Sequence, residues 1–151
     1  MSELAHIETI VFLQSVDLFS FCKAEEVLRV AAITQERRFA AGEKIFRRDD
    51  LADRIYCVVR GEIELDSSSA GSNDSEEAQN GERMGPLSTF GVLEILSGKL
   101  RTTSASALTD TLLLVLEAED FFDLLSNNIE IVKALFRYVV RELHEGQETM
   151  G

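Results

Sequence analysis

The sequence predicts a mainly β protein with flanking helices, of the antiparallel sandwich or jelly-roll class. Apolar residues recur at helical spacing near both ends of the chain, and short strand-like runs separated by turn residues lie between them. Short, evenly spaced strands are typical of a sandwich or jelly roll. A length of 151 residues is near the usual size of one domain, so we expect a single domain over residues 1–151.

Helical spacing defines the two ends of the predicted domain. Near the N-terminus it covers Leu4–Gln14 and Ala24–Thr34, so we expect N-terminal helices within residues 1–35. The same spacing returns from Glu119 onward, with Asn127 and Asn128 marking a break between two helices. We therefore expect C-terminal helices within residues 118–145.

The β barrel is expected between these helices, over residues 36–117. Gly42, Gly61 and Gly91 separate strand-like runs, and each suits a tight turn or a close approach of the backbone. The predicted strands are Arg37–Phe39, Lys44–Phe46, Ile55–Val59, Glu62–Leu65, Ser104–Leu108 and Leu112–Leu116.

Residues 66–81 interrupt this pattern. They contain almost no side chains to bury and carry four acidic residues, Asp66, Asp74, Glu76 and Glu77. We interpret the segment as a mobile loop, a tolerated insertion between strands. A phosphorylated or partner-binding segment is the alternative.

Composition excludes several classes of function. A net charge of −12 opposes binding to nucleic acid, because contact with phosphate backbones needs a basic surface. No apolar run approaches the roughly 20 residues that cross a bilayer, so we expect no membrane insertion. The N-terminus lacks the features of a signal peptide, and a cytoplasmic location is expected.

Neither a metal site nor an active site is predicted. Cys22, Cys57, His6 and His144 are too few and too scattered for a metal site, and we expect two buried or half-buried free thiols. No nucleophile–base or acid–base constellation surrounds either histidine. The acidic residues after position 116 are interpreted as the start of a helix. The chain is therefore predicted not to be an enzyme and to hold no metal or cofactor.

Four segments, in order and spacing, resemble the cyclic nucleotide-binding domain family of catabolite-activator-type regulators, kinase regulatory subunits and cyclic-nucleotide-gated channels. The segments are Leu13–Phe19, Arg38–Phe46, Ala52–Leu65 and Phe90–Ala105. The first is similar to the helix that precedes the barrel in the family, and the last has the length of the family's phosphate-binding cassette. The resemblance covers about Phe12 to Glu145. It implies a double-stranded β-helix (jelly roll) barrel with N-terminal helices and a C-terminal helical lid.

The cassette also has a physical basis. A glycine turn that opens a short helix presents free N–H groups to an anion, and an arginine can form paired hydrogen bonds with phosphate oxygens. Arg101 occupies the position of the family's phosphate-binding arginine; without the resemblance, a surface arginine paired with Glu94 or Asp110 is the simpler interpretation. The resemblance implies cyclic-nucleotide contacts at these residues: Gly91, Val92, Leu93, Glu94, Arg101, Thr102 and Thr103.

The cassette departs from the family at Val92, where members that bind tightly have a glutamate that accepts a hydrogen bond from the ribose hydroxyl. Losing such a bond costs about 1.5–3 kcal/mol, about ten- to a hundredfold in affinity. Glu94, two positions later, either reaches the ribose or crowds the site. Thr102 follows Arg101 as in members that favour cGMP.

Two functions remain open. The first is a regulatory sensor that binds cAMP or cGMP and relays binding through the C-terminal helix to an attached or separate effector. The second is a degenerate domain that binds no nucleotide and serves as a structural or protein-interaction module. The C-terminal helix is also a candidate homodimer surface. Because the 151 residues have no room for a helix-turn-helix, a transcription regulator would require that the chain be an excised piece of a longer protein.

Overall fold

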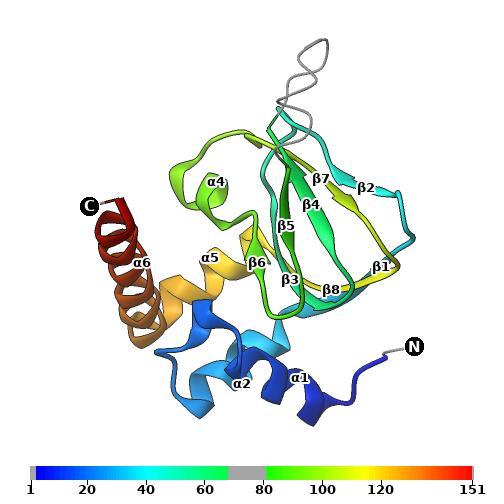
Figure 1. Ribbon diagram of the computed structural model, residues 1–151. Helices are drawn as coiled ribbons and strands as arrows, with labels where there is room; N and C mark the ends of the chain where they lie inside the picture. Colours follow the sequence, from blue (N-terminus) through cyan, green and yellow to red (C-terminus); the bar gives the residue numbers. More distant parts are fainter. Residues whose placement is uncertain (1–2, 68–80, 151) are drawn as a thin grey trace. The chain divides into compact units, whose positions relative to one another are not determined.

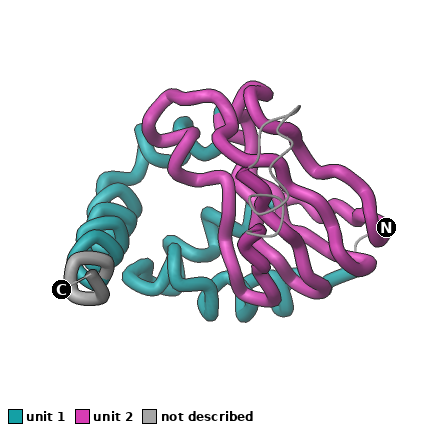
Figure 2. The backbone as a smooth tube through the Cα atoms, turned by 45° about the horizontal axis from the view of Figure 1, so that its top comes forward, with its two compact units in different colours: residues 1–34, 119–151 teal, residues 35–118 magenta. Residues whose placement is uncertain are grey.

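The computed structural model describes residues 3–67 and 81–150, with side chains up to residue 145. The chain forms two compact units, which Figure 2 colours separately. Residues 35–118 form one unit, and residues 1–34 together with 119–151 form the other. Most of the predicted loop 66–81 lies outside the described residues.

The 35–118 unit contains two four-stranded sheets that face each other (Figure 1). The strand orders are β1-β8-β3-β6 and β2-β7-β4-β5, and each strand pair described in register is antiparallel. This arrangement confirms the predicted jelly roll. Its elements are β1 (Thr34–Phe39), β2 (Lys44–Phe46), β3 (Arg54–Arg60), β4 (Ile63–Asp66), β5 (Glu82–Met84), β6 (Thr89–Phe90), α4 (Val92–Ser97), β7 (Ser104–Ala107) and β8 (Thr111–Glu117).

The barrel interior is closed by side chains from both sheets. Tyr56 and Phe90 stack with ring centroids 5.0 Å apart, and Phe46 from the opposite sheet lies 5.7 Å from Tyr56. Aromatic pairs at these separations contribute about 0.5–1.5 kcal/mol beyond their buried area. The buried cluster consists of Phe46, Tyr56, Val58, Ile63, Phe90, Ala105, Leu113 and Val115.

The other unit is helical. Its elements are α1 (His6–Gln14), the 3-10 turn η1 (Asp17–Phe19), α2 (Ala24–Ala32), α5 (Ala118–Asn127) and α6 (Ile129–Met150). Glu26 accepts a hydrogen bond from the Lys23 N–H at 2.7 Å, which caps the start of α2. The Arg141 guanidinium of α6 lies 5.0 Å from the Phe21 ring centroid and 5.6 Å from that of Tyr138.

Several predicted boundaries were wrong. Thr34 begins β1 rather than ending a helix, and its hydroxyl donates to the Ala31 carbonyl at 2.8 Å. The segment Leu13–Phe19 is the end of α1, a turn and η1 rather than one helix. Strands β5 and β6 were not predicted, because their few, partly polar residues acquire strand structure only by pairing with β4 and β3. The break at Asn128 between α5 and α6 is confirmed.

The three predicted glycine turns all have left-handed backbones, with φ of 88° at Gly42, 94° at Gly61 and 86° at Gly91. The two cysteines are free as expected, with Cys57 buried and Cys22 half-buried. Burial raises the pKa of the Cys57 thiol to about 12. Within the described residues, no helix has the length and apolar character required to cross a membrane.

Gly61→Ala tests the close approach of β3 to β8. A Cβ at Gly61 would lie 2.5 Å from Thr111 Oγ1 and 2.6 Å from the Asp110 carbonyl oxygen. We expect this variant to lose about 2–4 kcal/mol of unfolding free energy in urea, from backbone strain plus steric clash. Gly42→Ala is the matched control, because its φ is also positive but nothing lies within 4 Å of the added Cβ. Equal losses in the two variants would contradict the close approach.

Candidate functional site

The site begins at the turn between β6 and α4. Gly91 is the N-terminal cap of α4 and has a left-handed backbone, φ 86°. An added Cβ there would lie 2.7 Å from Arg101 Nη1 and 3.1 Å from the Arg54 carbonyl oxygen. Glycine is therefore required at this position for two reasons, its backbone conformation and the closeness of the arginine.

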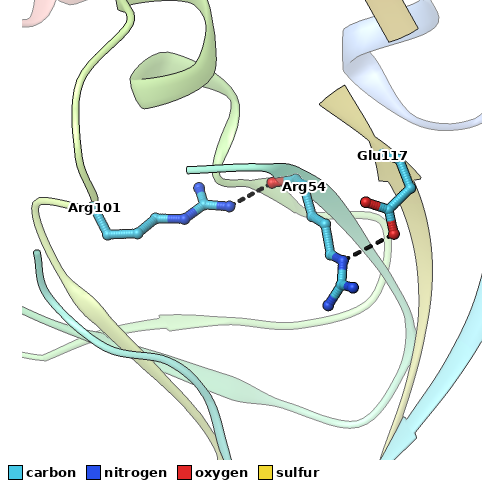
Figure 3. A network of polar contacts seen from close by, with 3 residues as sticks. All are labelled: Arg54, Arg101 and Glu117. Atoms are coloured by element: carbon cyan, nitrogen blue, oxygen red, sulfur yellow. Dashed lines mark hydrogen bonds and ion pairs between the residues drawn. The ribbon is translucent and has the colours of Figure 1, made fainter. Parts of the chain in front are cut away.

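Arg101 follows α4 and extends into the barrel. Its side chain is only 1% exposed, which makes it the largest fully buried side chain in the described part of the chain. Nη1 donates a hydrogen bond to the Gly91 carbonyl at 2.9 Å, and Nη2 donates to the Arg54 carbonyl at 2.6 Å. Figure 3 shows the arginine extended toward the Arg54 carbonyl, while the Arg54 side chain itself bonds Glu117. The interpretation of Arg101 as a surface arginine was therefore wrong.

Aromatic rings face the same guanidinium. Its central carbon lies 4.3 Å from the Phe46 ring centroid and 5.8 Å from that of Tyr56. Cation–π contacts of this kind contribute about 0.5–2 kcal/mol. Burial lowers the pKa of the Arg101 guanidinium, and the nearby Tyr56 and Glu94 act in the opposite direction. An arginine stays protonated in spite of this shift, so the barrel holds a buried positive charge.

The Arg101 guanidinium does not use all of its hydrogen-bond donors. Among the described residues, Arg101 Nε is buried without a hydrogen-bond partner. The guanidinium has five N–H donors, and its two bonds to carbonyl oxygens use two of them. A buried cation is usually paired with a carboxylate, but here its hydrogen bonds go to main-chain carbonyls. The unused donors make this group suited to an anion.

A loop that sequence reasoning missed holds the backbone of Arg101. The Asp49 N–H donates to the Arg101 carbonyl at 2.8 Å, and the Arg101 N–H donates to the Asp50 carbonyl at 2.9 Å. Asp49 has a left-handed backbone with φ 73°, and the Asp50 carboxylate accepts from the Arg47 N–H at 2.9 Å. The adjacent aspartates, which favour such turns, were the available sequence signal.

The remaining cassette residues lie at its outer side. Glu94 Oε1 is 3.4 Å from Thr102 Oγ1 and 3.5 Å from the Thr102 amide nitrogen, so these two predicted residues are brought together by weak hydrogen bonds. Val92 is the first residue of α4 and is half-buried, as is Thr103. Leu93 is 73% exposed and takes no part in the buried contacts of Arg101.

Comparison with known sequences assigns this architecture to a family. Residues 36–128, which include β2 to β8, most of β1 and the cassette, match the family described as Cyclic nucleotide-binding domain. The chain belongs to this family. Its fold is that of the cyclic nucleotide-binding domains of catabolite-activator and kinase regulatory type, as the resemblance of the four segments predicted.

Relatives of several kinds match this chain over part of their own length. The Cyclic AMP receptor protein of Thermus thermophilus is 30% identical over 128 residues, which cover 85% of this chain and 57% of that protein. A cyclic nucleotide-gated potassium channel of Mesorhizobium japonicum is 29% identical over 128 residues, 85% of this chain and 33% of the channel. This chain thus spans about three-fifths of the first relative and one-third of the second.

A solved structure supports the same assignment. The N-terminal domain of a transcriptional regulator from Streptomyces coelicolor superposes with a TM-score of 0.77 at 28% identity. The match covers 93% of this chain and 97% of that domain. The chain therefore matches, over nearly its whole length, a structure described as the N-terminal domain of a transcriptional regulator.

Proposed function

We propose that this chain is a regulatory sensor domain that binds a cyclic nucleotide, cAMP or cGMP, at its cassette. The observation that carries the proposal is the buried Arg101 cation with unused donors beside the N-terminal cap of α4. A cyclic phosphate would supply the full negative charge that the two carbonyl oxygens lack. The ligand contacts would be made by Gly91, Val92, Leu93, Glu94, Arg101, Thr102 and Thr103.

Binding requires the cassette to open. Since Arg101 is 1% exposed, a phosphate reaches its guanidinium only when neighbouring groups move apart. The ligand must then bind the open arrangement better than the closed one, and this difference in affinity is the free energy available for signalling. We propose that the C-terminal helix passes the change to an effector, attached or separate, and that the domain itself catalyses no reaction and works in the cytoplasm.

The outer side of the cassette sets the affinity. Val92 cannot accept a hydrogen bond from a ribose hydroxyl, and the Glu94 carboxylate is within reach of Thr102. A ligand that recruits Thr102 would compete with Glu94, but both contacts are long, and their loss costs little. The result is a site with a strong phosphate anchor and a weak ribose anchor.

Isothermal titration calorimetry with cAMP and cGMP tests the proposed function. We expect saturable binding of at least one nucleotide, weakened about ten- to a hundredfold in Arg101→Lys, which keeps the charge but not the paired donors. Val92→Glu should instead tighten binding about tenfold or more by restoring a carboxylate acceptor. Circular dichroism verifies that both variants are folded. Absence of binding heat at millimolar nucleotide in both the parent chain and Val92→Glu would refute the proposal.

A second function is favoured by one specific observation on α6. Phe136, Val140 and Leu143 share one face of this helix at spacings of four and three residues, and they are 69%, 49% and 65% exposed. We propose, as the alternative, a structural or interaction module that uses this face to form a homodimer or to bind a partner protein. Exposed apolar stripes of this kind mark helix–helix interfaces.

Sedimentation analysis of the purified chain tests this interface. We expect a concentration-dependent homodimer that Val140→Glu converts to monomer, because the new carboxylate would be buried in an apolar contact. Glu142→Gln, about 160° away around the helix, is the control and should leave the dimer unchanged. A parent chain that stays monomeric at high concentration would exclude self-association through α6.

A further inference from the structure

A carboxylate lies on the outer side of the cassette, apart from the contacts that hold the Arg101 guanidinium. It belongs to Glu94, the third residue of α4, which is half-buried. Glu94 Oε1 accepts hydrogen bonds from the Thr102 N–H at 3.5 Å and from the Thr102 hydroxyl at 3.4 Å. Because Thr102 directly follows Arg101, a negative charge is held beside the residue that carries the buried positive charge.

Hydrogen bonds of opposite charge tie α4 to the segment that follows it. On the inner side, Arg101 Nη1 donates to the Gly91 carbonyl at 2.9 Å. On the outer side, the Glu94 carboxylate accepts from Thr102, and the Glu94 carbonyl accepts from the Lys99 N–H at 2.8 Å. The Lys99 bond fixes the backbone from which the carboxylate extends. A phosphate that reaches the guanidinium would therefore lie near a negative charge of the same cassette.

The Glu94 carboxylate acts on the charge of Arg101 more directly than other carboxylates of this unit. Burial lowers the pKa of the Arg101 guanidinium, and nearby groups oppose this shift: Tyr56, Glu94, Asp53 and Asp50. Asp50 and Asp53 are exposed, so water and salt screen their charges, whereas Glu94 is half-buried. Among these carboxylates, Glu94 is therefore the one whose charge an anion at Arg101 would meet with the least screening.

We propose that Glu94 is a specificity-determining residue, which selects ligands by the charge on their phosphate group. A phosphodiester, such as a cyclic nucleotide, carries one negative charge. A phosphate monoester carries nearly two above its second pKa of about 6. Arg101 alone would favour the monoester, and repulsion from Glu94, which grows with the charge of the ligand, offsets that preference. This inference rests on the proposed function, because it concerns ligands of the same site.

The expected size of the selection follows from Coulomb's law. Repulsion between a half-buried carboxylate and a nearby phosphate, screened by water and salt, weakens the binding of a singly charged ligand by about threefold. The same repulsion acts twice on a doubly charged ligand, so the factor is squared, to about tenfold. A domain with this carboxylate responds to a cyclic nucleotide and discriminates against the monophosphate that hydrolysis of the cyclic ester produces.

Calorimetric titration of Glu94→Gln at about pH 8, where the monoester is doubly charged, tests the proposal. The probes are cAMP with 5′-AMP and cGMP with 5′-GMP. We expect the variant to bind the cyclic nucleotide about threefold and the matching monophosphate about tenfold more tightly than the parent chain does. Glutamine keeps the volume of the side chain and an oxygen acceptor for Thr102, so the charge is what changes. Comparing the two changes cancels the difference in shape between the ligands.

Glu62→Gln is the matched control, because it removes the same charge from an exposed position just after β3, about 20 Å along that strand from Arg54. It should leave both dissociation constants within about twofold of the parent values. If the monophosphate binds the parent too weakly to measure, its binding should become measurable in Glu94→Gln and not in the control.

Two outcomes separate this inference from the proposed function. If the cyclic nucleotide binds, but Glu94→Gln changes both affinities by the same factor or leaves the monophosphate undetectable, the inference is overturned and the proposed function stands. If no nucleotide binds the parent chain or Val92→Glu, the proposed function is refuted and the role of Glu94 is refuted with it.

Discussion

The buried cation of Arg101 is the interaction on which the architecture of the 35–118 unit depends most. Through its guanidinium it binds the carbonyls that precede α4 and begin β3, and through its backbone it binds the loop after β2. Three segments distant in sequence therefore meet on one residue. Removing it would take one hydrogen-bond donor from each of two carbonyl oxygens and leave a void beside Phe46.

The same cation makes this unit suited to binding an anion. Burying a positive charge is costly, and carbonyl dipoles with an aromatic face compensate that cost less completely than a carboxylate would. A bound anion would therefore stabilise this buried charge further. In the proposed function, a phosphate that reached Arg101 would change the balance between the closed and open cassette, and the linked segments would transmit that change to β2, β3 and α4.

The sequence was informative where a local pattern reflects a local cause. Gly42, Gly61 and Gly91 predicted tight turns or close approaches of the backbone, and all three have a positive φ. Strand β8 was recognisable from the unbroken apolar run Leu112–Leu116. This run reflects burial, because six of the seven residues of β8 are buried. The order of these features predicted the family, which the match over residues 36–128 confirms.

Features that depend on pairing could not be predicted from local sequence. Strand β5, Glu-Arg-Met, is defined by its register with β4 and not by its own propensity. The inward direction of Arg101 depends on the carbonyls of Gly91 and Arg54, 10 and 47 residues away in sequence.

Urea unfolding of Arg101 variants measures the central interaction most directly. The account predicts that Arg101→Ala loses about 2–4 kcal/mol of unfolding free energy, and that Arg101→Met, which fills the volume but donates no hydrogen bond, recovers only part of it. Arg47→Ala, at an exposed position of the neighbouring loop, should change stability by less than about 0.5 kcal/mol. An Arg101→Ala variant as stable as the parent chain would contradict the account.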